Sequence, residues 1–301
     1  MTSPSFAASS AAPAAALAGV RILSLALNLP GPAALMRCRS MGAICTKLEP
    51  ASTDGKPTDP MAQYAPEAYA AMHEGVALMQ ANLKTDEGQE LLHAELARTD
   101  VLITSFRPSA LAKLGLSWDA LHARYPRLSL IAIVGAPGAR AEEPGHDLTY
   151  LAESGLVTGT ALPPTLYADM GGSLMASEAV LQAMLHRSTH QTGVQIDVAL
   201  SEAAHYLALP RQWGLTQPSG SVGGAHAGYR VYACADGRVA VAALEPHFAN
   251  ALSDVAGLPS RNMFSSATHT ALAAWLRDRT CEELDALAAK HDIPLHTLAE
   301  I

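Results

Sequence analysis

The sequence has few cysteines, few charges and no excess of basic residues, and each shortage excludes a class of protein. Its four cysteines, Cys38, Cys45, Cys234 and Cys281, form no CxxC pair and show no metal-ligand spacing. We therefore expect reduced thiols, no disulfide and no metal site. Lysine and arginine number 20 against 28 aspartates and glutamates, a formal net charge of -8. This balance argues against nucleic-acid binding, because phosphate backbones require a basic face.

Long apolar runs are also missing. No stretch approaches the roughly 18 uninterrupted apolar residues of a membrane span, so we expect no transmembrane helix and no membrane partner. Residues 1–16 are rich in Ala, Ser and Pro and lack the basic start and apolar run of a secretory signal. We predict a disordered tail there and a cytoplasmic location.

What is present is typical of a globular protein with a buried sheet. Hydrophobic residues make up 49% of the 301 residues, which is ample for a core. Compact apolar runs alternate with segments of helical periodicity, and the runs are read as strands at 19–27, 43–50, 101–106 and 127–135. Alternation of this kind favours β-α-β units and a parallel sheet. We predict an α/β fold with a large Rossmann-like domain.

A second, smaller domain is predicted after a Gly-, Ser- and Pro-rich stretch. The segment 217–228 reads "QPSGSVGGAHAG", which is typical of a linker. Beyond it, 229–244 carries two β runs around Asp236-Gly237, a strong hairpin signal. We therefore expect a large α/β domain over 17–212, a linker over 213–228 and a small α+β domain over 229–301.

Three short stretches carry candidate functional side chains. In "EEPGHDLTYLAESGL" (142–156), His146 and Asp147 stand at the start of a predicted helix, where Asp147 fits an N-cap equally well. In "LYADMGGSL", Asp169 precedes two glycines at a helix start, so it is either a cap or part of a site approached by a ligand. In "AALEPHF", Glu245 follows an apolar strand, where α/β sites gather but caps also occur.

Six ordered blocks resemble one family. They are "LAGVRILSLALNLPGPAALM", "DVLITSFRPSALAKLGLSWDAL", "YPRLSLIAI", "GHDLTYLAESG", "ADMGGSL" and "TGVQIDVAL". In this order they resemble the family III CoA-transferases (the CaiB/BaiF superfamily), which includes α-methylacyl-CoA racemase. The resemblance covers residues 17 to about 250 and implies that family's fold, with coenzyme A as part of the substrate and no covalently bound cofactor.

Within the family, the block "GHD" resembles the racemase branch, as do "ADMGG" and "LEPHF". The resemblance implies that His146 and Asp169 are the catalytic acid/base pair and that Glu245 supports them. Inverting the carbon next to a thioester carbonyl needs two such groups, one on each face. Histidine suits one face because its unperturbed pKa is about 6.5, and the carboxylic acid must be kept protonated on the other. Asp147 would act through its backbone N–H on the enolate oxygen.

A second reading stays open, in which the chain moves CoA between carboxylic acids. The Asp147 side chain would then attack the acyl-CoA and carry CoA as an aspartyl thioester. His146 would play no chemical part. The two readings differ in their need for an acceptor acid, because a racemase exchanges a proton on one substrate.

The family's basic cluster for CoA phosphates is replaced here by "HEGVALMQANLK" (73–84). We therefore look elsewhere for phosphate contacts, and the candidates are Arg37, Arg39, Lys47 and Arg107. This departure keeps a third hypothesis open, a catalytically degenerate homologue that binds an acyl ligand or a partner subunit. The resemblance also implies a homodimer, which in this family is interlocked.

Overall fold

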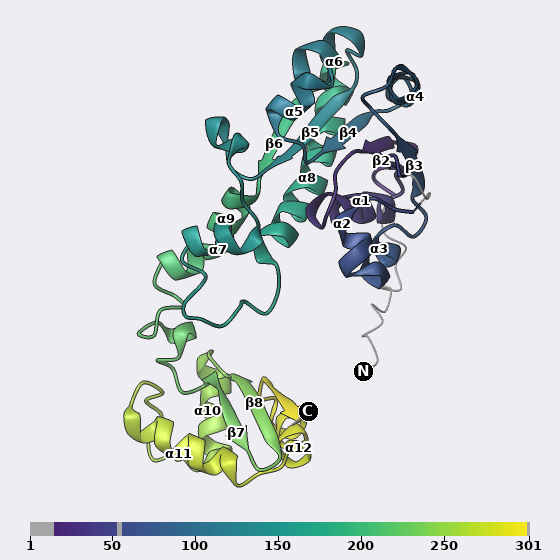
Figure 1. The fold of residues 1–301 in the computed structure, drawn as a ribbon. Helices are drawn as coiled ribbons and strands as arrows, with labels where there is room; N and C mark the ends of the chain where they lie inside the picture. The colour runs from purple at the N-terminus through teal and green to yellow at the C-terminus, as the bar shows by residue number, and fades with distance from the viewer. Residues whose placement is uncertain (1–14, 53–55, 300–301) are drawn as a thin grey trace. The chain divides into compact units, whose positions relative to one another are not determined.

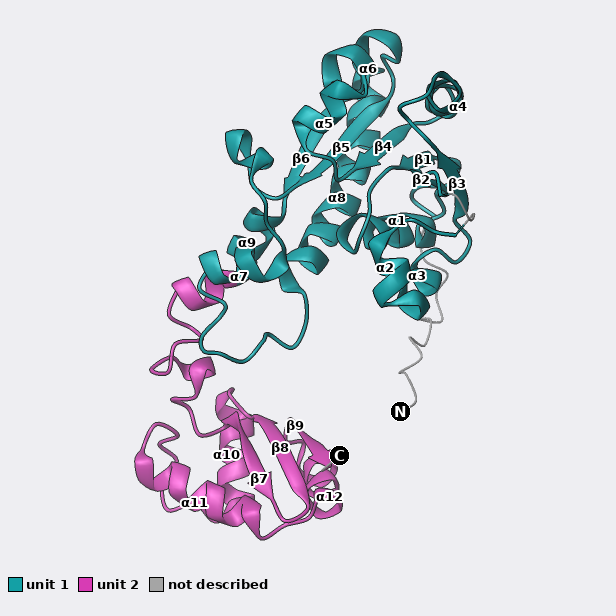
Figure 2. Ribbon diagram, viewed as in Figure 1, with its two compact units in different colours: residues 1–207 teal, residues 208–301 magenta. Residues whose placement is uncertain are grey.

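The computed structural model describes residues 15–52 and 56–299, and the chain divides into two compact units, 1–207 and 208–301 (Figure 2). The tail expected over residues 1–16 lies, up to residue 14, outside the described residues. The division falls inside helix α9 (Leu200–Gln212), before the segment that we expected as a linker. Late in that segment Ala227 is buried and its N–H donates to the Met263 carbonyl. Its Gly and Ser residues therefore serve turns that belong to unit 2.

Unit 1 is built on a six-stranded parallel sheet in the order β3-β2-β1-β4-β5-β6 (Figure 1). The strands are β1 (Arg21–Ser24), β2 (Ile44–Pro50), β3 (Ala77–Ala81), β4 (Val101–Thr104), β5 (Ser129–Val134) and β6 (Gln195–Ala199). The four predicted strands are present, and the predicted α/β class with a parallel sheet is confirmed. Strand β3 was not predicted, because this half-exposed edge strand has neither a long apolar run nor a clean alternation.

Helices cover both faces of this sheet. They are α1 (Pro30–Ser40), α2 (Pro60–Tyr64), α3 (Pro66–Met72), α4 (Asp86–Leu96), α5 (Pro108–Lys113), α6 (Trp118–Arg124), α7 (Asp147–Glu153), α8 (Tyr167–His190) and α9, with a short 3-10 turn η1 (Gly138–Glu142). Along the central strands, Ile22 and Ile103 belong to the core shared with α1 and α8, and Leu23 and Leu102 to the core shared with α4, α5 and α6. The sheet is thus buried on both faces, as parallel sheets require.

The strand order creates a crevice at the carboxyl ends of the central strands β1 and β4. Strand β1 is flanked by β2 and β4, so the connection after β1 leads to one side and the connection after β3 returns to the other. In open α/β sheets, ligands bind outside the carboxyl ends of the strands at such a switch point. The loops after β1 and β4 are therefore the first place to look for a site.

Unit 2 is a small α+β domain, described here by itself. Its antiparallel sheet has the order β7-β8-β9 and is formed by β7 (Tyr229–Cys234), β8 (Gly237–Ala242) and β9 (Leu295–Ala299). Its helices are α10 (Pro246–Ala256), α11 (Ser266–Arg277) and α12 (Cys281–His291), after the 3-10 turn η2 (Ser221–Gly223). The hairpin predicted around Asp236-Gly237 is confirmed by the pairing of β7 with β8. Among the described helices of the whole chain, none is both long enough and apolar enough to cross a bilayer.

Candidate active site

A cavity of about 200 Å³ opens outside the carboxyl ends of β1, β4 and β5. Its lining comes from the end of β5, from the loops that follow these strands, including η1, and from the starts of α1, α7, α8 and α9. The residues are Leu27, Asn28, Pro30, Ser105, Phe106, Arg107, Ile133, Val134, Gly135, Ala141, Glu143, Gly145, His146, Tyr150, Asp169 and Leu200. The cavity thus lies at the switch point of the sheet and includes three of the residues predicted from the sequence, Arg107, His146 and Asp169.

His146 reaches the cavity from the start of α7. It occupies the N-cap position, and its backbone N–H donates to Thr149 Oγ1 at 3.1 Å. That bond fixes the backbone, while the exposed imidazole lines the cavity. The residue is thus held in place through its main chain, and its ring faces the cavity.

Asp169 reaches the same cavity from the first turn of α8. Burial, followed by the charge of Asp147, raises the pKa of its carboxyl group to about 6, and His146 lowers it in part. The two side chains line the same cavity. No hydrogen bond or ion pair joins them in the part of the chain that the structure describes. They are neighbours around a common space rather than partners.

The local sequence suggested that Asp147 caps its own helix, but in the structure it does not. It is the first residue of α7, and its Oδ1 accepts hydrogen bonds from the backbone N–H groups of Ala168 at 2.7 Å and Asp169 at 3.0 Å. These groups belong to the first turn of α8, whose own cap residue Leu166 offers no side-chain bond. Asp147 therefore caps α8 from a different loop and ties the two halves of the candidate site together.

The two glycines after Asp169 also have a different use from the one suggested by sequence. They lie inside α8, where a Cβ on Gly172 would come within 2.2 Å of the Leu200 side chain and one on Gly171 within 3.2 Å of Leu207. They allow α8 and α9 to pack closely, and they offer no backbone approach to a ligand. Asp169 accordingly lies within the first turn of α8 and not at its cap position.

Tyr150 forms a buried wall of the cavity and was not singled out from the sequence. A Cβ on either Gly135 or Gly145 would lie 2.4 Å from its hydroxyl oxygen. This is the physical reason for glycine before His146, since any side chain there would displace the tyrosine. Burial and the charge of Asp169 raise the pKa of Tyr150. Both Gly145 and Tyr150 are present in the motif "GHDLTY", but only the fold shows that the glycine makes room for the tyrosine.

Of the four predicted phosphate contacts, Lys47 is engaged elsewhere. It is fully buried, and its ammonium group lies 2.5 Å from Asp59 Oδ2, 3.1 Å from Glu49 Oε1 and 3.1 Å from His73 Nε2. Three donors therefore meet three acceptors inside the protein. This corrects the sequence-based expectation, because Lys47 has no N–H group left for a phosphate.

The three arginines differ in their surroundings. Arg107 is exposed at the N-cap position of α5 and lines the cavity. Arg37 is exposed on the last turn of α1 and donates from Nε to Ser177 Oγ at 3.1 Å. Arg39, also on the last turn of α1, has a buried Nε without a partner among the described residues. Only Arg107 is brought to the candidate site.

Glu245 lies in unit 2, exposed, at the N-cap position of α10. Its backbone carbonyl accepts from the Ala249 N–H at 2.9 Å, and its side chain makes no capping bond. In unit 1, sequence reasoning missed Asn28, which lines the cavity with a φ of 64°. Asparagine is among the few residues that adopt this left-handed conformation readily.

Comparison with known proteins identifies the family of the chain. A family model described as CoA-transferase family III matches residues 17–301. The chain is 31% identical over 265 residues to the α-methylacyl-CoA racemase of Mus musculus, covering 82% of this chain and 66% of that protein. It is 28% identical over 204 residues to the cinnamoyl-CoA:phenyllactate CoA-transferase of Clostridium sporogenes, covering 62% and 50%.

Solved structures show the same fold. The crystal structure of Rv3272 from M. tuberculosis superposes with a TM-score of 0.80 at 23% identity, covering 94% of this chain and 83% of that one. A CaiB/BaiF family protein from Brucella suis gives 0.76 at 24% identity, covering 94% and 84%. The chain spans about half the length of the curated transferases that it matches and 66% of the mouse racemase. The match over 17–301 makes this chain a member of CoA-transferase family III.

Proposed function

We propose that the chain is an acyl-CoA enzyme that moves the α-proton of a 2-methylacyl-CoA thioester, as a racemase or epimerase. The observation that carries this proposal is the shared cavity, in which His146 and Asp169 come from different helices without bonding to each other. Two acid/base groups around one space are what inversion at a single carbon requires.

In this scheme His146 removes the α-proton from one face of the substrate. The electron pair of the broken C–H bond moves toward the thioester carbonyl, and the Asp169 carboxyl group returns a proton to the opposite face. The raised pKa of Asp169, about 6, supports the role because it keeps part of the population protonated near neutral pH. The reverse direction uses the same two groups with their protonation states exchanged.

Asp147 has a supporting role in this proposal. Its Oδ1 accepts the two N–H groups that begin α8, and its own backbone N–H is a donor to the enolate oxygen. Arg107 is the candidate for contact with the phosphates of CoA, since it lines the cavity and carries the needed charge. Glu245 remains the supporting carboxylate that the racemase resemblance implies.

The alternative is transfer of CoA between acids through an Asp147 thioester. It is supported by curated relatives that are named as CoA-transferases, among them the clostridial enzyme and the succinate–glutarate CoA-transferase of Agrobacterium fabrum. Against it stands the hydrogen bonding of Asp147, because acylation of this carboxylate would remove the charge that caps α8. The racemase proposal uses that carboxylate as it is found.

The test is deuterium wash-in at the α-carbon of a 2-methylacyl-CoA in D₂O. We expect exchange by the unmodified chain and a loss of about 10²- to 10⁴-fold in His146→Ala and in Asp169→Asn, the usual contribution of a general acid or base. The matched control is His190→Ala, at the far end of α8. Exchange that persists unchanged in His146→Ala would rule out the assignment.

Asp147→Asn separates the two enzymes. The amide oxygen of asparagine still accepts the two N–H groups, so a racemase keeps its exchange within about tenfold, whereas a transferase loses CoA transfer because an amide is not the required nucleophile. Transfer is measured with an acyl-CoA and a second carboxylic acid. A thermal shift with acetyl-CoA identifies the third case: no stabilisation and no turnover favours a degenerate homologue.

A further inference from the structure

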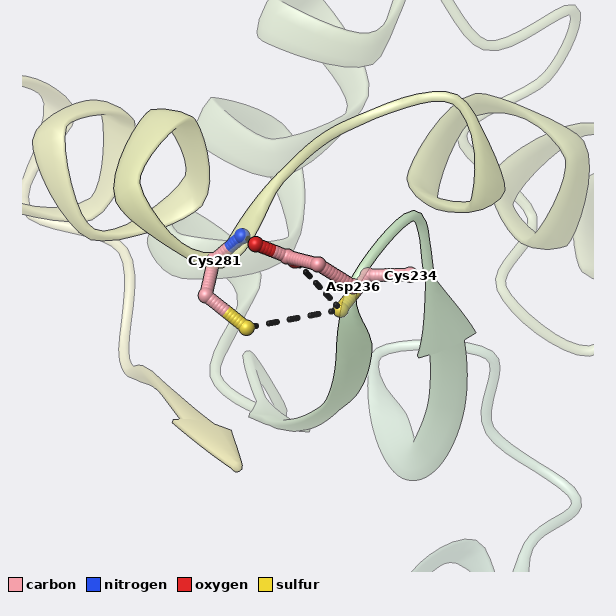
Figure 3. Close-up of side chains that lie close together, drawn as sticks. All are labelled: Cys234, Asp236 and Cys281. Carbon is pink, nitrogen blue, oxygen red and sulfur yellow. Dashed lines mark hydrogen bonds between the residues drawn. The ribbon is translucent and has the colours of Figure 1, made fainter. Parts of the chain in front are cut away.

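Two cysteines and an aspartate from distant parts of unit 2 come together at the end of the β7–β8 hairpin (Figure 3). Cys234 is the last residue of β7, Asp236 lies in the turn that follows, and Cys281 is the first residue of α12. The two Sγ atoms are 3.7 Å apart, and the Cys234 thiol donates to Asp236 Oδ1 at 3.8 Å. Cys234 and Cys281 are 47 positions apart in the chain, so no ligand spacing was visible in the sequence.

The positions of these atoms are already set by the backbone. The Cys281 N–H donates to Asp236 Oδ1 at 2.7 Å, which holds the turn against the start of α12. A second bond runs beside it, from the Ala235 N–H to the Arg279 carbonyl at 2.7 Å. The three side chains therefore belong to one braced junction between the hairpin and the helix.

The spacing agrees with a thiolate metal site. Zinc binds thiolate sulfur at about 2.3 Å in tetrahedral geometry, which puts two coordinating sulfur atoms about 3.8 Å apart. One ligand atom from each of the three residues lies within 4.8 Å of the other two. Cys234 is buried, Cys281 is half-buried and Asp236 is exposed, so the cluster has a rigid side and an open side from which a cation and a water can enter.

We propose that Cys234, Asp236 and Cys281 bind a divalent cation of the zinc class, with water as the fourth ligand. The two thiols lose their protons to solvent, and the thiolates and the carboxylate each donate an electron pair to the cation. Soft sulfur ligands select zinc-like ions over magnesium or calcium, which prefer oxygen alone. The bound ion would join the end of β7 to the start of α12 and stabilise unit 2.

A disulfide between Cys234 and Cys281 is the competing fate of the two thiols. It would require the sulfur atoms to close from 3.7 Å to about 2.05 Å, and Asp236 would then contribute only its hydrogen bond to the Cys281 N–H. The carboxylate oxygen beside the sulfur atoms disfavours the thiolate that must attack an oxidant, whereas an arriving cation stabilises all three anions together. The metal site uses every group of the cluster.

Cobalt(II) provides the test, because it occupies zinc sites and its thiolate complexes have a charge-transfer absorption band. The full chain is reduced, stripped with a chelator and titrated with Co²⁺ and then Zn²⁺. We expect the band to rise to one equivalent, to disappear when Zn²⁺ displaces the cobalt, and to accompany a Tm increase of about 5 °C or more for unfolding of unit 2.

The variants assign the band to this cluster. Cys234→Ser and Cys281→Ser should each abolish it, and Asp236→Asn should weaken binding by about 10-fold or more. The controls are Cys45→Ala in unit 1 and Asp254→Asn, an exposed aspartate of unit 2, and both should bind as the unmodified chain does. Because Asp236 is exposed in a turn, its variant tests the site even if a cysteine variant fails to fold.

Three results would overturn the proposal. The first is the absence of a cobalt band in the reduced chain. The second is a band of unchanged intensity in the two serine variants, which would move the metal to another site. The third is a mass decrease of two hydrogens, mapped to a Cys234–Cys281 disulfide that forms in air before added Zn²⁺ is bound.

Discussion

Two of the clusters of titratable side chains in unit 1, one around Lys47 and one at the cavity, differ in how completely their polar groups are hydrogen-bonded. Around Lys47, the ammonium group has three acceptors, Glu49 also accepts from the Tyr69 hydroxyl at 2.7 Å, and Asp59 also accepts from the Asn28 and Met61 N–H groups. Around the cavity, His146 and Asp169 make no bond with each other, and burial leaves Asp169 with a raised pKa.

The difference explains why the proposed chemistry is assigned to the cavity and not to the Lys47 cluster. In the Lys47 cluster, an ammonium group can only donate, so His73 Nε2 must accept from it and His73 Nδ1–H must donate to the Tyr69 carbonyl at 2.7 Å. Burial lowers the pKa of His73, in keeping with this neutral form. Every proton there has a fixed place, whereas the proposed function requires His146 and Asp169 to exchange protons with a substrate. The Lys47 cluster is arranged to stabilise the fold, and the cavity pair has the unpaired groups that the proposed reaction needs.

The largest effect that would test this contrast is the loss of Lys47. Lys47→Met should lower the free energy of unfolding by about 3–5 kcal/mol, because Glu49 and Asp59 would stay buried without their counter-charge. Urea unfolding of the purified chain measures it, with the exposed Lys84→Met as a control expected within about 0.5 kcal/mol. A loss below about 1 kcal/mol for Lys47→Met would mean that the cluster is not a stabilising unit.

Replacement of Asp169 should change the free energy of unfolding in the opposite direction to replacement of Lys47. Its pKa is raised from 3.8 to about 6, so the native state binds the proton more tightly than the unfolded chain, and stability falls as the pH rises through this window. Asp169→Asn removes that cost. We expect the variant to be more stable than the unmodified chain by on the order of 2 kcal/mol at pH 7.

The pH dependence is the decisive part of the measurement. The stability difference between Asp169→Asn and the unmodified chain should vanish near pH 3.5, where both carry a neutral side chain, and should grow up to pH 7. Urea unfolding at a series of pH values measures it. A difference that is constant with pH would show that Asp169 is not ionised at the expense of stability.

A smaller effect on stability is expected when the hydrogen bonds between Asp147 and the start of α8 are removed. Asp147→Ala removes the acceptor for the Ala168 and Asp169 N–H groups and should cost about 1 kcal/mol of stability, the usual value of a helix cap. Asp147→Asn keeps an acceptor and should cost only a few tenths. Equal losses in the two variants would show that the cap is not what Asp147 contributes.

The smallest effect concerns Arg107, which is exposed. Arg107→Gln should raise KM for an acyl-CoA by about two- to fivefold with little change in kcat, because an exposed charge contact is worth about 1 kcal/mol or less. The increase should shrink at high salt. The control is Arg127→Gln, an arginine outside the cavity lining that bonds to Gln191. A fall in kcat with unchanged KM would contradict a role in binding.

Much of the fold could be predicted from local patterns. The runs that became β4 and β5 are apolar on both faces, and those that became β1 and β2 are mostly apolar with a few polar residues. The helix that became α4 has Thr85 as its cap, bonded to the Gly88 N–H. Strand β3 could not be predicted, because its edge position leaves it half-exposed and its sequence without a pattern. Buried elements leave a periodic signature in the sequence, while an edge strand depends on its neighbour for pairing.

The candidate site was also only partly predictable from the sequence. His146, Asp147 and Asp169 were found from residue type and family resemblance, but their partners were not, because each partner lies on another element. Local sequence suggested that Asp147 caps α7, and the fold makes it the cap of α8, 21 positions away from Ala168. Lys47 was expected at a phosphate and is instead buried among acidic groups, a burial that its position in strand β2 did not reveal.

The sequence by itself determined the α/β class, the family and the residue types available for proton transfer, because these follow from local periodicity and from short contiguous motifs. The tertiary structure decided which cation is buried in ion pairs, which aspartate is a cap and which has a raised pKa, and which thiols are neighbours. Those properties depend on distance and burial, and side chains such as Cys234 and Cys281 acquire them only when the chain folds.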